Sequence, residues 1–273
     1  MSNVEATDFQ RSLTELTNAK LDKLEAFSSI ASTNTYLLSL PAPAPGRFRV
    51  AIADHQTSGR GRHSRRWISP PESGLYLSIS YTFLEMPKHL PGLTLALGVA
   101  VIDALTILEV EGVSLKWPND IVAQDGKLGG ILTEVQSSES EGVTVVIGIG
   151  LNMHLRERID FGAESDWAHR AVDLKTIAKE LPPRELLAGT LIECVYATCV
   201  RYEALGFEEF AGEWRQHDWL MGREITVDMP DRQITGIAAG VDADGALIID
   251  NHSGKTRVIS GSIVMAGLTE FGQ

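Results

Sequence analysis

Apolar residues recur along the chain with two different periods, and each period predicts one kind of element. The segment 75–83 (LYLSISYTF) alternates apolar and polar residues, which predicts a strand with one buried face. The segment 143–153 (VTVVIGIGLNM) is apolar nearly throughout, which predicts a central strand. The segment 93–108 carries a single charge, Asp103, over 16 residues, so it is too short to span a bilayer and predicts a buried helix.

The stretches between these runs carry start and stop signals for further elements. Before residue 26, apolar residues at helical spacing predict one short helix (Phe9, Leu13 and Leu16). A strand, a turn and a second helix follow, and one of three polar residues caps that helix (Ser32, Thr33 or Asn34). We expect further strands at 49–54, 113–117 and 129–135, a turn across 118–120 and 125–126, and helices from 174 to 215.

The pattern changes near Gly222, where short alternating runs separated by tight turns replace the helical spacing. The turns at 242–245 and 253–254 predict a small antiparallel barrel of roughly 45 residues. We therefore expect an α+β fold with two units: a mixed central sheet flanked by helices over residues 1–219, and a small β-barrel over residues 220–273.

Composition narrows the class of partner. With 273 residues and 44% hydrophobic content the chain can bury a full core. Its net charge of −12 argues against the phosphate backbone of a nucleic acid as the main ligand. The first ten residues (MSNVEATDFQ) lack the apolar core of a signal peptide, so we expect a cytoplasmic protein without a membrane partner.

Cysteine and histidine spacing argues against a protein-built metal centre. Cys194 and Cys199 are the only two cysteines, and their spacing fits buried reduced thiols rather than metal ligands. The seven histidines are scattered and form no HExxH motif. We expect no metal ion held by protein ligands alone.

Positive charge is concentrated in one short segment of this acidic chain. Residues 59–67 read GRGRHSRRW, with four arginines between two glycines and a tryptophan. Backbone N–H groups and guanidinium groups in such a loop can converge on an anion, and the indole can stack on a base. This segment predicts a pocket for a small anionic ligand with an aromatic base. A solvated basic loop is an equally weighted alternative on this segment alone.

Three further motifs combine polar residues with glycines. They are LKWPND (115–120), DGKLGG (125–130) and GIGLN (148–152). Each alone is common turn or strand chemistry. None matches a phosphate-binding GxxxxGK[ST] loop or a dinucleotide fingerprint, so neither a P-loop nor a Rossmann fold is favoured.

Taken in order with STN (32–34) and QTSGRGR (56–62), these motifs strongly resemble those of the biotin protein ligases. The resemblance runs from about residue 30 to residue 267. It implies a class II synthetase-like catalytic domain followed by a small SH3-like barrel, and an ATP-dependent biotin–[biotin carboxyl-carrier protein] ligase.

The resemblance also implies a role for each matching residue. Biotin would be bound by Ser32, Thr33, Asn34, Gln56, Gly59, Arg60, Gly61, Arg62, Lys127 and Gly130. ATP and the adenylate would be bound by Arg60, Arg62, Arg65, Trp67, Lys116, Asn119, Asp120, Lys127 and Asn152. The catalytic residues would be Lys127, Arg62 and Asp120. Lys127 would bridge the biotin carboxylate and the α-phosphate. Asp120 would orient the incoming lysine or act as its base, unless it serves only the turn or the metal.

The implied reaction has two steps. Biotin and ATP form biotinyl-5'-AMP with release of pyrophosphate, and a lysine of a biotin carboxyl carrier protein domain then takes biotin and releases AMP. Fixed cations stabilise the negative charge that develops in both steps. Mg²⁺ is expected with the triphosphate, near Asp120 if the protein contacts it. The resemblance leaves open whether the protein is a monomer or a homodimer.

Two other functions fit parts of the same pattern. A lipoate ligase shares the fold, but its RRxxGG loop is not present, because WISP follows Arg66 here. A non-catalytic sensor of biotin or its adenylate is the second alternative, and the retained Lys127 and Asp120 argue against it.

The chain departs from the family pattern at several positions. Ser64 stands where many members have glycine, Ala31 where aspartate is frequent, and KLGG replaces KLAG. The segment after GIGLN also lacks a small-residue motif often found there. About 30 residues precede STN, too few for the winged helix-turn-helix of the repressor members, so we expect no DNA binding.

Overall fold

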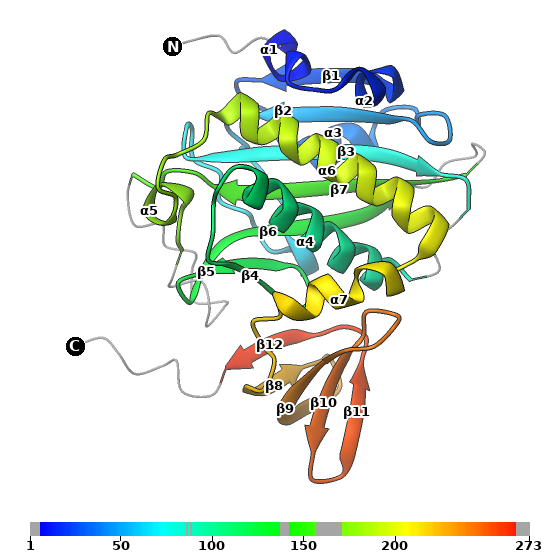
Figure 1. The fold of residues 1–273 in the computed structure, drawn as a ribbon, viewed down its shortest axis with the longest axis vertical. Helices are drawn as coiled ribbons and strands as arrows, with labels where there is room; N and C mark the ends of the chain where they lie inside the picture. Colours follow the sequence, from blue (N-terminus) through cyan, green and yellow to red (C-terminus); the bar gives the residue numbers. More distant parts are fainter. Residues whose placement is uncertain (1–5, 86, 88, 137–141, 157–170, 266–273) are drawn as a thin grey trace.

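A computed structural model describes residues 6–85, 87, 89–136, 142–156 and 171–265 (Figure 1). A seven-stranded sheet forms the first unit, in the order β1-β2-β3-β7-β6-β5-β4. Its strands are β1 (Leu21–Phe27), β2 (Phe48–Ala53), β3 (Gly74–Phe83), β4 (Val113–Lys116), β5 (Asp120–Ala123), β6 (Gly126–Gln136) and β7 (Val143–Asn152). Strands β1 and β2 pair in parallel and all other neighbours pair antiparallel, so the sheet is mixed, as predicted.

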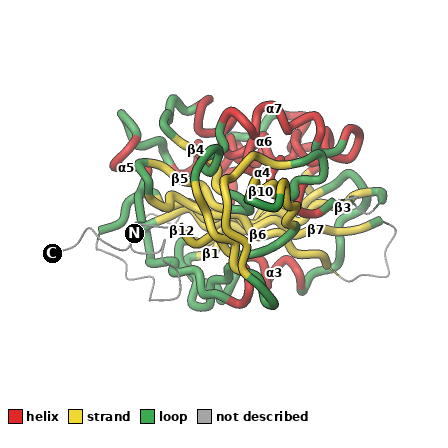
Figure 2. Tube along the Cα trace, turned by 90° about the horizontal axis from the view of Figure 1, so that it is seen from below, coloured by secondary structure: helices red, strands yellow, loops and turns green. Residues whose placement is uncertain are grey.

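Helices cover the two faces of this sheet unequally (Figure 2). The long helices α4 (Leu90–Ile107) and α6 (Arg184–Leu205) pack on one face, together with α7 (Glu208–Gln216). The short helix α3 (Thr33–Leu38) packs on the other face, against β2, β3 and β7. Since α3 covers only part of that face, the remainder is available to line a cavity.

The second unit is a five-stranded antiparallel sheet in the order β11-β10-β9-β8-β12. Its strands are β8 (Glu224–Asp228), β9 (Gln233–Val241), β10 (Leu247–Asn251), β11 (Gly254–Val258) and β12 (Ser262–Met265). The α+β class with a separate small all-β unit is therefore confirmed. The domain boundary at residue 219 and the SH3-like assignment stay predictions.

Strand β3 corrects one prediction from the alternating pattern. All ten of its residues are buried, so it does not have a single buried face. Its polar side chains are satisfied internally: the Ser78 hydroxyl bonds to α3, and the Thr82 hydroxyl donates to the Pro43 carbonyl oxygen. A polar residue in an alternating strand is thus buried when a helix on that face supplies its partner.

The predicted short helix before residue 26 is also wrong, because two helices form there, α1 (Ala6–Arg11) and α2 (Glu15–Lys20). Thr14 interrupts the run and caps α2 by accepting a hydrogen bond from the Thr17 amide. Leu16 is 73% exposed and takes no part in the buried stripe. At α3 the capping residue is Ser32, one of the three predicted.

Three boundaries elsewhere differ from the expected pattern. Asp120 begins strand β5 instead of lying within a turn. The helical stretch 174–215 is divided into α5 (Leu174–Ile177), α6 and α7, with prolines 182 and 183 before α6 and Gly206 after it. Proline cannot extend a helix interior, and Gly206 has a positive φ of 72°, which ends α6.

Helix α4 is the one described helix that is long and apolar enough to cross a membrane by composition. Within the fold 67% of that stretch is buried, and the helix packs against α6, α7 and the sheet. It is therefore the central core helix, as its sequence predicts, although at 18 residues it is longer than expected.

Candidate active site

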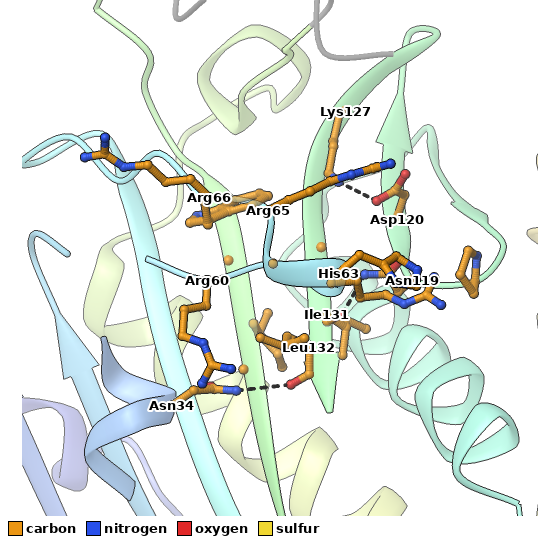
Figure 3. Close-up of a pocket in the computed structure, with 18 of the residues that line it drawn as sticks. Asn34, Arg60, His63, Arg65, Arg66, Asn119, Asp120, Lys127, Ile131 and Leu132 are labelled. Carbon is orange, nitrogen blue, oxygen red and sulfur yellow. Dashed lines mark hydrogen bonds and ion pairs between the residues drawn. The ribbon is translucent and has the colours of Figure 1, made fainter. Parts of the chain in front are cut away.

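A cavity of about 620 Å³ opens on the sheet face that α3 covers in part (Figure 3). Strands β3 to β7, the start of α3, the arginine loop (residues 59–67) and the segment 261–264 of the second unit line it. Every predicted site residue except Gly59 lines this one cavity: Ser32, Thr33, Asn34, Gln56, Arg60, Gly61, Arg62, Arg65, Trp67, Lys116, Asn119, Asp120, Lys127, Gly130 and Asn152. The structure therefore brings together five motifs that lie far apart in the sequence, while the role of each residue stays a prediction.

Gly59 lies outside the cavity and packs within the loop. A Cβ atom at this position would lie 2.4 Å from the carbonyl oxygen of Trp67. The carbonyl oxygen of Gly59 also accepts a hydrogen bond from the Trp67 amide at 2.9 Å. A side chain at residue 59 would separate the two ends of the loop, so this glycine shapes the loop rather than lining the cavity.

The arginine loop doubles back on itself. Arg60 and Arg66 form an antiparallel bridge, and the Gly61 amide donates to the Arg65 carbonyl oxygen at 2.8 Å. At the tip, His63 and Ser64 have positive φ angles of 54° and 60°. This left-handed conformation favours glycine, which gives a physical reason for glycine to be accepted at position 64.

Lys127 and Asp120 form a close ion pair at one end of the cavity. The distance from Lys127 Nζ to Asp120 Oδ1 is 2.5 Å, and Lys116 Nζ lies 3.8 Å from Asp120 Oδ2. Burial alone would raise the pKa of the Asp120 carboxyl, but Lys127, Lys116 and Arg62 outweigh it and hold that pKa below its usual value. Asp120 is therefore an anion that aligns two ammonium groups.

The neighbouring strands place these three side chains together. Lys116 at the end of β4 pairs in register with Asp120 at the start of β5. Lys127, near the start of β6, pairs with Val122 of β5. The WPN turn (117–119) joins β4 to β5, and the DG turn (125–126) joins β5 to β6. Because both turns are short, the three strands bring both lysines to one carboxylate.

Burial also changes the acidity of two cations in the cavity. It lowers the pKa of Lys116 to about 8, against the attraction of Asp120, and repulsion by Lys127 and Arg65 adds to the effect. Burial likewise lowers the pKa of the Arg62 guanidinium, which nevertheless stays charged at neutral pH. The cavity lining holds six cationic side chains (Arg60, Arg62, Arg65, Arg66, Lys116 and Lys127) and two carboxylates, Asp120 and Asp228. A strongly acidic chain thus contains a cavity suited to an anion.

Polar side chains form the opposite end of the cavity. The Thr33 amide donates to Gln56 Oε1 at 2.9 Å, and Gln56 Nε2 donates to Ser69 Oγ at 3.2 Å. Ser78 Oγ lies 2.6 Å from both Thr33 Oγ1 and Asn34 Oδ1. All of these residues are buried, so their partners orient them before any ligand binds.

Trp67 lies between the two ends of the cavity. Lys127 Nζ is 5.6 Å from the centre of its ring. Its indole N–H is buried, and no residue in the described part of the chain accepts a hydrogen bond from it. A ligand acceptor could satisfy this donor, which is consistent with a binding site around the ring.

The amide groups of Asn119 and Asn152 mainly hold the backbone. Asn119 Nδ2 donates to the Ile131 carbonyl oxygen at 2.7 Å. Asn152 Nδ2 donates to the carbonyl oxygens of Lys127 at 3.2 Å and Val172 at 3.0 Å. Both N–H groups of Asn152 are used in this way, so only its side-chain oxygen remains for a ligand, whereas Asn119 keeps its oxygen and one N–H.

Sequence patterns did not indicate several residues of this region. Ser78 lies in a predicted strand and belongs to no motif, while the lining residues Asp228 and 261–264 come from the second unit. Arg65 connects the units, donating from NH2 to Ser262 Oγ at 3.2 Å. Only the register between strands and the docking of the second unit bring these residues to the cavity.

The donor set at Asp120 does not fit a Mg²⁺ site built by the protein. Both carboxylate oxygens face ammonium groups, whereas Mg²⁺ requires several oxygen ligands. Among the described residues, no group of three or more His, Cys, Asp or Glu side chains could hold a metal ion.

Comparison with known proteins places this site in a family. A model described as "Biotin/lipoate A/B protein ligase family" matches residues 26–152, and one described as "Biotin protein ligase C terminal domain" matches residues 220–265. The biotin–[acetyl-CoA-carboxylase] ligase of Mycobacterium tuberculosis is 33% identical over 250 residues, covering 89% of this chain and 88% of that protein. The bifunctional ligase/repressor BirA of Escherichia coli is 33% identical over 221 residues, covering 81% of this chain and 67% of that protein.

Solved structures agree with these sequence matches. The biotin protein ligase from Aquifex aeolicus in complex with biotin and ATP superposes with a TM-score of 0.74 at 27% identity, over 89% of this chain and 98% of that one. The chain belongs to the biotin protein ligase family.

Proposed function

We propose that this protein is an ATP-dependent biotin ligase that forms biotinyl-5'-AMP and then biotinylates a lysine of a biotin carboxyl carrier protein domain. One observation carries the proposal: the Lys127–Asp120 pair, the arginine loop and the buried polar set around Thr33 and Gln56 line a single cavity. The names of the relatives support the reaction class, and the Aquifex complex supports biotin and ATP as its substrates.

The two ends of the cavity suit the two ends of biotin. The ureido ring has compact donors and acceptors, and the polar end offers preoriented partners for them (Ser32, Thr33, Asn34 and Gln56). Arg60, Gly61 and Gly130 would contact the rest of biotin. The carboxylate would then reach the cationic end, where Lys127 and Arg62 lie.

In the first step, a biotin carboxylate oxygen bonds to the α-phosphorus of ATP, and the bond to the pyrophosphate oxygen breaks. Negative charge accumulates on the oxygens around the phosphorus, and the Lys127 ammonium and Arg62 guanidinium would stabilise it. The nucleotide would be held by the remaining predicted residues (Arg65, Trp67, Lys116, Asn119 and Asn152). Mg²⁺ would enter with the triphosphate oxygens and neutralise part of their charge.

In the second step, the acceptor lysine amine attacks the biotinyl carbonyl carbon, the bond to AMP breaks, and the amine loses a proton. The low pKa of Asp120 makes it a weak base, and its oxygens already face Lys127 and Lys116. We therefore propose that Asp120 positions Lys127 instead of removing the amine proton. A normal second half-reaction by Asp120→Asn from preformed adenylate would support this assignment over the base role.

Biotin-dependent exchange of labelled pyrophosphate into ATP tests the proposed function. Lipoate and octanoate serve as parallel substrates, because the family model includes lipoate ligases. Exchange with biotin alone supports the proposal. Exchange with lipoate or octanoate instead would reassign the substrate, and tight biotin binding without exchange would indicate a sensor.

We infer further that the protein acts in the cytoplasm on a carrier protein and not on nucleic acid or membranes. The net charge of −12 supports this, since a nucleic-acid surface needs a basic face. Salt-dependent binding to duplex DNA would contradict the inference.

A further inference from the structure

Glu134 lies on β6 directly behind two cavity residues without lining the cavity itself. Its Oε1 atom is 2.7 Å from Arg60 NH2, and its Oε2 atom accepts a hydrogen bond from Asn34 Nδ2 at 2.9 Å. The side chains of Arg60 and Asn34 lie next to each other at the polar end of the cavity (Figure 3). One carboxylate therefore binds the start of the arginine loop and one residue of the pocket floor. The floor is the set of buried polar residues Thr33, Asn34, Gln56, Ser69 and Ser78.

Hydrogen bonds extend this contact across the floor. Asn34 is linked to Ser78, Ser78 to Thr33, Thr33 to Gln56, and Gln56 to Ser69, with distances between 2.6 and 3.2 Å. Ser69 follows the loop by two residues. The series thus begins at Arg60 and ends just beyond Trp67, so it connects both ends of the loop through the floor.

Glu134 fixes the orientation of Asn34 together with the Leu132 carbonyl oxygen, which accepts a longer hydrogen bond of 3.4 Å from the same Nδ2 atom. A carboxylate can only accept hydrogen bonds, so the Asn34 side chain must direct its NH₂ group toward Glu134. Asn34 Oδ1 then faces Ser78 Oγ, 2.6 Å away. The reversed amide would place its oxygen against both of these acceptors, so Glu134, the nearer of the two, helps to determine which atoms of Asn34 and Ser78 are presented to a ligand.

We propose that Glu134 is a positioning residue that couples the position of the arginine loop to the hydrogen-bond pattern of the biotin pocket. Two acceptor oxygens allow it to bind Arg60 and Asn34 at once, whereas a glutamine offers one. This inference rests on the proposed function, because it concerns the same site. Glu134 would act on biotin binding through Arg60 and Asn34, without touching the substrate.

Glu134→Gln tests the proposal in the pyrophosphate exchange assay. We expect KM for biotin to rise about tenfold, the typical effect of one lost hydrogen bond to a charged group. We expect kcat to change less than about twofold, because Lys127, Asp120 and Arg62 are untouched. KM for ATP should rise less than KM for biotin, because Arg60 is the one predicted nucleotide-binding residue that Glu134 contacts. The melting temperature should change little, since the Arg60 side chain is 45% exposed and such ion pairs contribute little to stability.

Glu25→Gln is the matched control. Glu25 is also a strand carboxylate that binds α3, accepting from Tyr36 Oη at 2.6 Å and pairing with Lys23 at 2.7 Å. Its side chain is 22% exposed, compared with 21% for Glu134. Its partners Tyr36 and Lys23 do not line the cavity, whereas Arg60 and Asn34 do. Equal biotin KM values for the two variants would overturn the proposal. A fall in kcat and melting temperature without a specific rise in biotin KM would overturn it as well.

A double-mutant cycle with Arg60→Ala tests the coupling itself. We compare the effect of Glu134→Gln on the biotin KM in two backgrounds, the Arg60→Ala variant and the unmodified protein. If Glu134 acts through Arg60, the rise in KM should be clearly smaller in the Arg60→Ala background. Fully additive effects would overturn the coupling. The unmodified protein separates the two ideas: absence of any biotin-dependent exchange refutes the proposed function, whereas normal exchange with an unaffected Glu134→Gln refutes only this inference.

Discussion

Gly150 and Trp67 are in direct contact across the cavity floor: a Cβ atom on Gly150 would lie 2.7 Å from Cε2 of the indole. Gly148 lies two residues earlier on the same face of β7, and a Cβ atom there would lie 2.3 Å from Asn34 Oδ1. The glycines of the GIGLN motif therefore make room for two side chains of the proposed site. They need not contact the ligand to be required for its binding.

Gly150→Ala should weaken ATP binding by displacing Trp67. If the indole stacks on adenine, the loss is about 1–3 kcal/mol, a value taken from base stacking in nucleic-acid sites. The ATP KM in the exchange assay measures it. Gly212→Ala is the control, because a Cβ at this helix position meets nothing within 4 Å. An unchanged ATP KM in Gly150→Ala and in Trp67→Ala would show that the indole only packs.

Lys127→Ala should abolish adenylate formation and leave the fold intact. Loss of a cation that stabilises transition-state charge costs roughly 10²–10³-fold in rate. Pyrophosphate exchange measures the rate, and the melting temperature checks the fold, since the Lys127 side chain is 28% exposed. Lys255→Ala, on an exposed strand of the second unit, is the control. Exchange at the normal rate would remove Lys127 from the chemistry.

Ser64→Gly should be tolerated, and Ser64→Val should impair the loop. Ser64 has a φ of 60°, where non-glycine residues cost roughly 1–2 kcal/mol and β-branched residues are especially unfavourable. We expect biotin KM to be unchanged or lower for the glycine variant and higher for the valine variant. Equal KM values would mean that the tip conformation does not influence biotin binding.

Lys116→Met should make the protein more stable at pH 7 and less active. Burial lowers the pKa of Lys116 from 10.5 to about 8, so below pH 8 the folded state bears the cost of a buried charge. Between about pH 8 and 10.5 Lys116 keeps its proton only in the unfolded state. The free energy of unfolding of the unmodified protein therefore rises with pH over this range.

Thermal unfolding of the two proteins from pH 7 to 10 measures the difference. The variant should be more stable at pH 7 by on the order of 1–3 kcal/mol, and its advantage should shrink above pH 8. The variant retains Lys127, whose Nζ lies 2.5 Å from Asp120 Oδ1 in the unmodified protein, as a partner for the carboxylate. A variant that is less stable at pH 7 would show that Lys116 is a net stabilising partner of Asp120.

Asp218→Asn should stabilise the protein at pH 8 and not at pH 4. Burial raises the pKa of Asp218 to about 6, and its Oδ2 atom has no hydrogen-bond partner in the described part of the chain. Because the pKa of Asp218 is higher in the folded than in the unfolded protein, its protonation adds to the free energy of unfolding. This stabilisation is complete below pH 3.8 and is lost as the pH rises through about 6. The Leu220 amide can still donate to the remaining oxygen.

Melting temperatures of the Asp218→Asn variant and the unmodified protein at pH 4 and pH 8 test this prediction. The gain at pH 8 should be on the order of 1–3 kcal/mol. An equal change at both pH values would mean that the Asp218 carboxyl does not titrate differently in the folded protein. Asp250→Asn, at an exposed position of β10, provides a comparison for general charge effects.

Local sequence patterns were sufficient to predict most helices and strands and to identify the family. The apolar run of α4, the continuous apolar strand β7 and the change of period near Gly222 each follow from side-chain hydrophobicity at neighbouring positions. Two errors came from local signals that were overlooked, the Thr14 cap of α2 and the prolines before α6. Another arose where distant contacts override a local pattern. Strand β3 alternates in sequence but is buried on both faces, because α3 supplies hydrogen bonds to its polar side.

By itself, the sequence determined which motifs are present, their order, and hence the residues proposed for biotin and ATP. Only the tertiary structure decided how those residues act on one another. Asp120 aligns Lys127 and Lys116 through the pairing of three strands, and Glu134 lies behind Asn34 and Arg60 although 100 and 74 residues separate it from them. Such contacts depend on strand register and loop closure, which no short-range pattern of residues encodes.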